Sequence, residues 1–176
     1  GYGGRELVRL LLIHPEAELV AVTSTSQAGE RLDDALPGFH GLSELVFEPF
    51  HPKELAERCD VVFLAVPSGE SAVLGKQLHD AGVRVIDIGA DFRLQDTAAY
   101  KQYYGLDHPA HELLPEAVYG LPPIYRDRLV DARIVAVPCC YPISIVPPLA
   151  PLADVTPFDV PIVIDSISGT SGAGRG

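Results

Sequence analysis

Residues 60–69 read DVVFLAVPSG, an unbroken apolar run that ends in a Pro-Ser-Gly turn. A continuous run of branched and aromatic residues is typical of a parallel strand that is covered on both faces. A helical pattern follows over 71–81, Gly82 is a natural residue to end that helix, and another strand is predicted over 84–88. This strand–helix–strand unit predicts a parallel sheet with helices packed against it.

The rest of the chain continues the alternation of strands and helices, which predicts a doubly wound, mostly parallel α/β fold. Further strands are predicted over 18–23, 133–137 and 160–164. Further helices are predicted over 6–13 and 53–58, within 26–50 and 93–130, and around 143–153, where Pro147 and Pro148 oppose one. Ligands bind such sheets beyond the carboxyl ends of the strands, so candidate sites are the turns at 67–69, 138–142 and 168–175.

Composition limits the classes of function. The chain has 176 residues, 47% of them hydrophobic, so it can bury a core and is not intrinsically disordered. A net charge of −11 disfavours nucleic-acid and membrane-surface partners. We find no signal peptide near the start and no apolar run of the roughly 20 residues that span a bilayer. Three cysteines, two of them adjacent, do not make a disulfide framework, so a reducing, cytoplasmic setting is expected.

Two segments near the start suggest a dinucleotide site. Gly1, Gly3 and Gly4 precede a helix, where backbone amides can approach a pyrophosphate, although a simple tail before a surface helix is the alternative. About twenty residues later, where such sites meet the adenosine ribose, the chain has hydroxyl groups and no carboxylate. This favours NADP over NAD, with an ordinary polar turn as the alternative; the four hydroxyl residues are Thr23, Ser24, Thr25 and Ser26.

Cys139 and Cys140 lie between two prolines at the end of a predicted strand. A cysteine at a strand-to-helix turn lies in the positive field of the helix N-terminus, which lowers its pKa and favours the nucleophilic thiolate. A pair of buried structural cysteines and a redox dithiol are the alternatives, while a disulfide between neighbours would strain the intervening peptide. Cys59 precedes a core strand and is expected simply to pack there.

Three other polar features allow more than one interpretation. Residues 168–175 read SGTSGAGR, whose amides, hydroxyls and guanidinium suit a phosphate or carboxylate, unless the segment is a flexible linker. Asp91 and Arg93 form either a structural ion pair or a ligand contact. His108 and His111 have a spacing that metal ligands on a helix could have, but no third ligand is suitably spaced, so no metal is predicted.

Taken together, these segments resemble the N-acetyl-γ-glutamyl-phosphate reductases of arginine biosynthesis. The resemblance runs along the whole chain, and its most specific strings are ADFRL at 90–94 and SGxSGAGR at 168–175. The other matching strings are Gly1-Tyr2-x-Gly4, Val22-Thr23-Ser24, Phe63-Leu64-Ala65-x-Pro67-x-Gly69, His108-Pro109, Tyr119-Gly120-Leu121-Pro122 and Cys140-Tyr141-Pro142.

The resemblance implies an NADPH-dependent reduction of an acyl phosphate to a semialdehyde, with release of phosphate, by a cytoplasmic homo-oligomer. Cys140 matches the family nucleophile, whose thiolate expels phosphate and leaves a thioester for hydride reduction. The residues that would hold NADP(H) are Gly1, Tyr2, Gly3, Gly4, Thr23, Ser24, Thr25, Ser26, Ala65, Pro67 and Gly69. The residues that would bind substrate are Arg93, Tyr141, Ser168, Gly169, Ser171, Gly172 and Arg175.

The chain also departs from the family pattern. Family members are roughly twice as long, so we expect a Rossmann-like dinucleotide domain over 1–138 that lacks its first strand, followed by the start of an α+β catalytic domain over 139–176. The family's general acid–base histidine would lie outside this sequence. Val137, Cys139 and Ile143 replace the family's Asn, Gly and Thr, and Thr25 replaces its Arg. A catalytically inactive fragment that binds at most a dinucleotide is the alternative, as are reductases of aminoadipyl or aspartyl phosphate.

Overall fold

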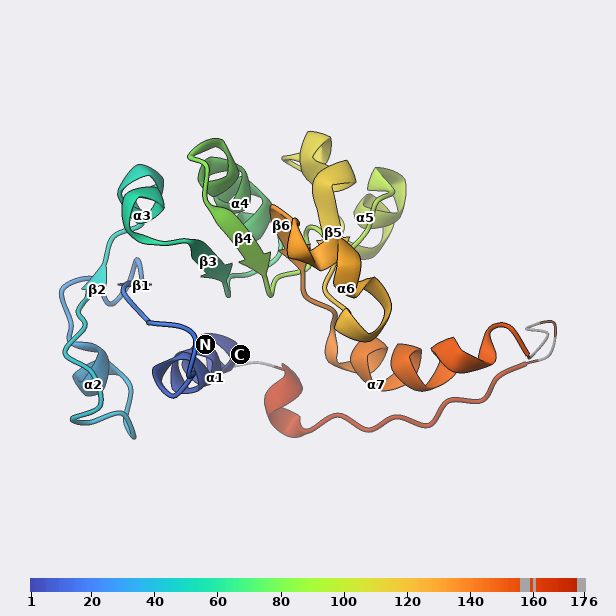
Figure 1. Ribbon diagram of the computed structural model, residues 1–176, viewed down its shortest axis with the longest axis horizontal. Helices are drawn as coiled ribbons and strands as arrows, with labels where there is room; N and C mark the ends of the chain where they lie inside the picture. The colour runs from blue at the N-terminus through green and yellow to red at the C-terminus, as the bar shows by residue number, and fades with distance from the viewer. Residues whose placement is uncertain (156–158, 160, 174–176) are drawn as a thin grey trace.

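The computed structural model describes residues 1–155, 159 and 161–173, and it has an α/β architecture with two parallel sheets (Figure 1). The larger sheet has the strand order β3-β4-β6-β5, with β3 at Val61–Leu64, β4 at Arg84–Asp87, β5 at Ala117–Tyr119 and β6 at Ile134–Ala136. The smaller sheet pairs β1 (Val22–Thr23) with β2 (Phe47–Glu48). Every pair in both sheets is parallel, as the sequence predicts.

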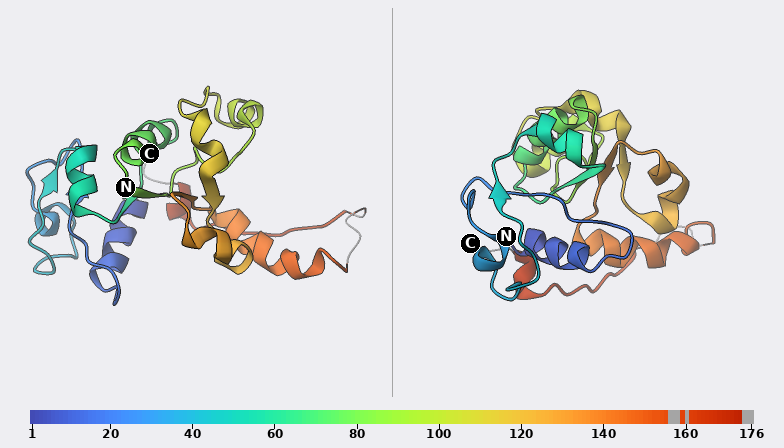
Figure 2. Two further views of the ribbon diagram at one scale, coloured as in Figure 1. Left: turned by 45° about the horizontal axis from the view of Figure 1, so that its top comes forward. Right: turned by 60° about the vertical axis from the view of Figure 1, so that its left-hand side comes forward.

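Helices cover both sides of the sheets, which makes the fold doubly wound. In Figure 1, α3, α4 and α5 lie above the strands, and α1 and α7 lie below them; the right-hand view of Figure 2 shows the same division. The α-helices are α1 (Tyr2–Leu12), α2 (Leu32–Ala35), α3 (Pro52–Arg58), α4 (Glu70–Asp80), α5 (Thr97–Tyr104), α6 (Pro122–Val130) and α7 (Cys140–Leu149). Short 3-10 helices are η1 (His111–Glu116), η2 (Ala150–Leu152) and η3 (Thr170–Ala173). Within the described residues, no helix has the length and apolar character that crossing a membrane requires.

In the described residues the core consists of three clusters of buried apolar side chains, two against the larger sheet and one against the smaller sheet. The cluster around Leu64, Leu78 and Val85 joins β3 and β4 to α3 and α4. A second cluster, which includes Phe92 and Ile134, lies under η1 and β6. The smaller sheet has its own cluster of Val22, Leu32, Phe39 and Phe47. The two sheets therefore bury their apolar side chains largely independently of each other.

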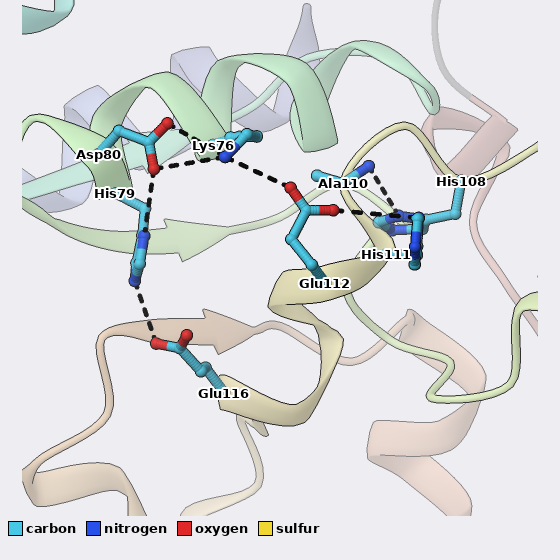
Figure 3. A network of polar contacts seen from close by, with 8 residues as sticks. All are labelled: Lys76, His79, Asp80, His108, Ala110, His111, Glu112 and Glu116. Atoms are coloured by element: carbon cyan, nitrogen blue, oxygen red, sulfur yellow. Dashed lines mark hydrogen bonds and ion pairs between the residues drawn. The ribbon is translucent and has the colours of Figure 1, made fainter.

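Ion pairs add polar contacts on the outer side of the larger sheet, between α4 and η1 (Figure 3). Lys76 Nζ lies 3.3 Å from a Glu112 carboxylate oxygen, and His79 Nε2 lies 3.1 Å from a Glu116 carboxylate oxygen. Lys76 also pairs with Asp80, one turn along α4, at 3.1 Å. Such solvent-accessible pairs contribute little to stability, so this contact orients η1 more than it stabilises the fold.

The two sheets meet at edges that carry no strand between them. In the described residues, β1 pairs only with β2, and β3 pairs only with β4. In Figure 1, β1 and β3 are the strands of the two sheets that lie nearest to each other. The expectation of a Rossmann-like sheet without its first strand is confirmed, because that strand belongs at the centre of the sheet.

Several sequence-based boundaries were wrong. The helix predicted over 6–13 begins at Tyr2, so Gly3 and Gly4 lie inside α1 rather than in a loop. The strand predicted over 18–23 is reduced to Val22–Thr23, because only these residues find a partner, in the unpredicted β2. The unpredicted β5 likewise forms because β6 offers a free edge.

The C-terminal part also differs from prediction. The described residues of the strand predicted over 160–164 are 161–164, and they form no strand because they lie along α7 rather than beside a sheet edge. Val160 lies outside the described residues. The helix predicted around 143–153 begins earlier, at Cys140, and contains Pro147 and Pro148 close to its end.

Candidate active site

Three turns meet where the parallel strands β3, β4 and β6 end, and they carry most of the site. Gly69 follows β3 and donates its N–H to the Asp91 carboxylate, which follows β4, at 2.8 Å. The N–H of Val137, after β6, donates to the carbonyl of Asp87, at the end of β4, also at 2.8 Å. Two of the three turns that the sequence offered as ligand sites, 67–69 and 138–142, are thus connected through β4 and the segment after it, as expected for the carboxyl edge of a parallel sheet.

Asp91 is a fully buried carboxylate that organises the start of α4. It accepts hydrogen bonds from the N–H of Gly69 and Ala72 and from the hydroxyls of Ser71 and Tyr100, all at 2.7–2.9 Å. Burial alone would raise the pKa of Asp91, but these four donors outweigh burial and lower the pKa below its usual value. Gly69 has a φ of +88°, a left-handed backbone conformation that glycine adopts readily because it has no Cβ.

The Asp87 carboxyl lies beside this network, but its pKa is raised where that of Asp91 is lowered. Burial raises the pKa of its carboxyl to about 6, and the nearby Asp91 charge adds to the rise. The N–H of Gly89 donates to Asp87 at 2.8 Å and the Ser71 hydroxyl at 3.3 Å, which opposes the rise only in part.

Arg93 does not pair with Asp91, which settles one of the alternatives that the sequence left open. Its Nε donates to the carbonyl of Val137 and its Nη2 to the carbonyl of Ile88, each at 2.8 Å. The guanidinium therefore connects the end of β4 to the end of β6, just before residues 138–142, which we call the cysteine turn. These carbonyl contacts also fix the direction in which the half-buried side chain presents its charge.

The two adjacent cysteines have different surroundings. Cys139 is half-buried, precedes α7 as its N-cap, and has an ordinary φ of −70°, so its Cβ causes no backbone strain. Burial alone would raise the pKa of Cys139, but hydrogen bonds from Cys140 and from the first amides of α7, together with Arg93, lower it. Cys140 is exposed, and its Sγ lies 3.7 Å from that of Cys139. The helix-terminus argument made from the sequence thus applies to Cys139.

A cavity of about 720 Å³ opens beside this turn. Its wall carries two cationic side chains, several aromatic rings and the Cys139 thiol, and no carboxylate is among the lining residues. The Arg128 guanidinium lies 5.7 Å from the centre of the Tyr125 ring, in cation–π range. The cavity is lined by Phe92, Arg93, Leu94, Gln95, Tyr104, Pro115, Ala117, Tyr119, Tyr125, Arg128, Cys139 and Pro142.

The predicted dinucleotide-binding residues fall into two neighbouring groups. The N-terminus of α1 approaches the turn after β3, since a Cβ at Gly4 would lie 3.8 Å from that of Ala65. Open space surrounds Gly1 and Gly3. Tyr2, Ala65 and Pro67 are exposed, and so are Thr23, Thr25 and Ser26 at the end of β1. The fourth hydroxyl, that of Ser24, accepts the N–H of Gln27 at 3.2 Å.

The predicted substrate-binding segment after residue 166 is not joined to the cysteine turn. In the described part of the chain, no hydrogen bond or ion pair links 168–172 to Cys139 or Cys140. Within it, Thr170–Ala173 form η3, and just before it the Ser166 hydroxyl lies 3.4 Å from that of Ser144 in α7. The predicted residues Ser168, Gly169, Ser171 and Gly172 are exposed, as is Tyr141, while Arg175 lies outside the described residues.

Sequence reasoning missed several residues of the cavity. Tyr125 and Arg128 come from α6, and only the packing of α6 against β5 brings them to the site. His108, for which no metal was predicted, has structural contacts: its Nε2 lies 2.9 Å from the Asp91 carbonyl and its Nδ1 accepts the Ala110 N–H. Cys59 packs against the core cluster of β3 and β4, as predicted, and burial raises its pKa.

Comparison with known proteins gives a consistent result. A family profile described as "Semialdehyde dehydrogenase, NAD binding domain" matches residues 1–132. Curated proteins named N-acetyl-gamma-glutamyl-phosphate reductase match nearly the whole chain, at 47% identity over 99% of it in Halorhodospira halophila and 46% over 100% in Pelotomaculum thermopropionicum. The chain spans about half the length of these relatives, 51% in both cases.

A solved structure supports the fold assignment. Aspartate semialdehyde dehydrogenase with NADP from Candida albicans is similar, with a TM-score of 0.64 over 88% of this chain and 44% of that one. The sequence identity is 19%, so this likeness concerns the fold alone.

Proposed function

The chain belongs to the semialdehyde dehydrogenase family, and we propose that it is the dinucleotide-binding part of an N-acetyl-γ-glutamyl-phosphate reductase. In this proposal the whole enzyme reduces the acyl phosphate to N-acetylglutamate semialdehyde and releases phosphate. The observation that carries the proposal is the 44–47% identity to reductases of that name over almost the entire chain, including the turns at the carboxyl edge of the sheet. The domain boundary is proposed near 138, after the profile match ends at 132.

The proposed cofactor is NADP(H), bound across the carboxyl edge of the strands. The α1 N-terminus, which approaches Ala65, would hold the pyrophosphate, with Pro67 and Gly69 on the other side. The exposed hydroxyls of Thr23, Thr25 and Ser26 have no carboxylate among them to repel a 2′-phosphate. When bound, the cofactor supplies the hydride for reduction.

Cys140 is the proposed nucleophile. Its exposed sulfur attacks the carbonyl carbon of the acyl phosphate, the carbon–oxygen bond to phosphate breaks, and a thioester remains on the enzyme. Hydrogen bonds from Cys140 and from the first amides of α7 lower the pKa of the neighbouring Cys139 thiol. This step needs no group other than the substrate and the cysteine.

The proposed substrate site collects positive charge and hydrogen-bond donors around that sulfur. Arg93 is held in place by two carbonyls and faces the cavity beside Cys139. A fixed guanidinium suits an anionic phosphate, because the charge needs no further ordering when the ligand arrives. The other proposed contacts are Tyr141, Ser168, Gly169, Ser171, Gly172 and Arg175, which would contribute in the full-length homo-oligomeric enzyme.

The cofactor proposal is tested by titrating the chain with NADPH and NADH and following cofactor fluorescence. Thr25→Glu places a carboxylate where the 2′-phosphate is proposed to lie. The affinity for NADPH should therefore fall by about tenfold or more, while the affinity for NADH should change little. Gln102→Glu adds the same charge on the exposed surface of α5 and serves as the control. Equal losses for both cofactors in the Thr25 variant would contradict the assignment.

A dinucleotide-binding fragment without turnover is the second candidate, favoured by the coverage of only half of each relative. Phosphate-dependent reduction of NADP with the semialdehyde, assayed on the natural protein as isolated from its cells, separates the two: turnover supports the reductase, and cofactor binding without turnover supports the second candidate. From these 176 residues alone we expect cofactor binding without turnover under either candidate.

A further inference from the structure

Cys139 and Cys140 form a close pair of free thiols, and Cys139 lines the cavity described above. We propose that this pair is a modification site for hydroperoxides, which oxidise it to a reversible disulfide and thereby mask Cys140. The inference goes beyond the reductase proposal and does not depend on it, since it concerns only the chemistry of the two sulfurs.

The geometry provides both an entry for the oxidant and a partner for the oxidised sulfur. Cys139 lines the cavity, which has the volume to admit a small hydroperoxide. The Sγ of Cys140 lies 3.7 Å from that of Cys139, so the second thiol is already near the sulfur that it would attack. Cys59 lies apart from the pair, in the core between β3 and α3, and cannot take this part.

Cys139 is the sulfur that we expect to react first. Its thiolate receives hydrogen bonds at the N-terminus of the ten-residue helix α7 and lies near the Arg93 guanidinium, which lower its pKa. A thiolate is the form that attacks peroxide. Burial in the core raises the pKa of the Cys59 thiol, which makes it a poor competitor.

The oxidation balances in two steps. The Cys139 thiolate attacks one oxygen of the hydroperoxide, so that a sulfur–oxygen bond forms, the oxygen–oxygen bond breaks, and an alcohol, or water from hydrogen peroxide, leaves after protonation. Cys140 then attacks the Cys139 sulfur, so that the sulfur–sulfur bond forms and the hydroxyl leaves as water with the Cys140 proton. The two thiols together lose two electrons and two protons.

The short connection between the sulfurs makes the modification reversible. A disulfide between neighbouring residues strains the peptide that joins them, and strained, exposed disulfides are the readily reduced ones. The dithiol, with both thiols free, is therefore the state that we expect before exposure to peroxide. The disulfide would form during exposure to peroxide and would protect Cys140 from irreversible oxidation to sulfinic acid.

The test is intact-mass and peptide analysis of the 176-residue chain after treatment with equimolar hydrogen peroxide. We expect a loss of two hydrogen atoms mapped to the peptide containing both cysteines, and a fall of about tenfold or more in Cys140 alkylation by iodoacetamide, restored by a dithiol reductant. The Cys59→Ala variant should behave in the same way.

Two further variants keep the test decisive. In Cys139→Ala, Cys140 should gain oxygen atoms instead of losing hydrogen, and in Cys140→Ala the same should occur at Cys139. Oxygen gained on either sulfur of the unaltered chain, or a disulfide to Cys59 or to a second copy, would overturn the proposal. Because the readouts are masses and alkylation rates, failure here leaves the reductase proposal untouched, and loss of cofactor binding leaves this one untouched.

Discussion

At the scale of single residues, two side chains of one motif, Asp91 and Arg93, have separate structural tasks. Asp91 fixes the turn after β3 to the start of α4, and Arg93 fixes the turn after β6 to the end of β4. Each uses its charge on neutral donors or acceptors rather than on the other. The motif thus aligns the loops that carry the proposed cofactor and cysteine residues.

The Asp91 network predicts a large loss of stability on truncation. Asp91→Ala leaves the N–H groups of Gly69 and Ala72 and the Tyr100 hydroxyl without their acceptor, and the free energy of unfolding should fall by about 3 kcal/mol or more. Asp107→Ala, which removes a carboxylate that is 84% exposed and paired with Lys101, should change it by less than about 1 kcal/mol. Urea denaturation at neutral pH measures both, and comparable losses would refute the assigned role.

Asp87 predicts a pH dependence with a definite sign. Its folded pKa of about 6 lies above the ordinary carboxyl value near 4, so the folded state binds the proton more tightly than the unfolded state. Its contribution to stability is therefore present below about pH 4 and is lost as the pH rises through about 6. Asp91 has a lowered pKa, so its contribution to stability is instead lost as the pH falls below the ordinary carboxyl value.

Asp87→Asn isolates this contribution, because the amide stays neutral. Relative to the unaltered chain, the variant should gain stability on going from pH 4 to pH 7.5, by up to about 3 kcal/mol. Urea titrations at both pH values measure the difference. A pH-independent difference between the two proteins would show that Asp87 ionises normally.

At the scale of secondary-structure elements, α4 packs closely because of one glycine. A Cβ at Gly75 would lie 2.8 Å from Phe92 Cε2 and 3.2 Å from its Cζ. Phe92 belongs to the core cluster under η1 and β6, so this contact sets how near α4 lies to the sheet. Phe92 and Cys139 also line the same cavity.

Gly75→Ala should therefore destabilise the protein, by about 1–3 kcal/mol, through overpacking. A glycine-to-alanine change inside an ordinary helix would instead stabilise it by up to about 1 kcal/mol, so the sign of the effect is diagnostic. Gln77→Ala, at an exposed position of the same helix, should have little effect. Thermal or urea denaturation decides, and a stabilised Gly75 variant would disprove the contact.

At the scale of the whole molecule, two sheets with separate cores meet without a shared strand. β4 is flanked on both sides by β3 and β6, whereas β1 has a single partner over two residues. Strands held on both sides open only with larger unfolding events, while short edge pairs open locally. The proposed adenosine-ribose segment at 23–26 is attached to the less protected part.

Hydrogen exchange should reveal this division. Peptides covering β4 and β6 are expected to exchange at least about a hundredfold more slowly than peptides covering β1 and β2, because only the former require opening of the larger core. Mass spectrometry of exchanged, digested protein measures the rates. Equal protection of the two sheets would show that they unfold as one unit.

The sequence by itself determined the local elements and their alternation. The apolar run of β3, the helical spacing of α4 and the terminating Gly82, which has a φ of +93°, are set by neighbouring residues, so they could be predicted. The same local character placed the candidate turns at the carboxyl ends of strands. Where prediction failed, as at 161–164 and β2, the outcome depended on whether a distant partner strand was available.

Only the tertiary structure decided what the polar residues do. Asp91 meets Gly69 across 22 residues and Arg93 meets Val137 across 44, and no local pattern encodes such pairings. Packing likewise forms the cavity wall, places Cys139 at the N-cap of α7 and raises the pKa of Asp87. The physical reason is that burial and hydrogen bonding act through space, whereas helix and strand preferences act along the chain.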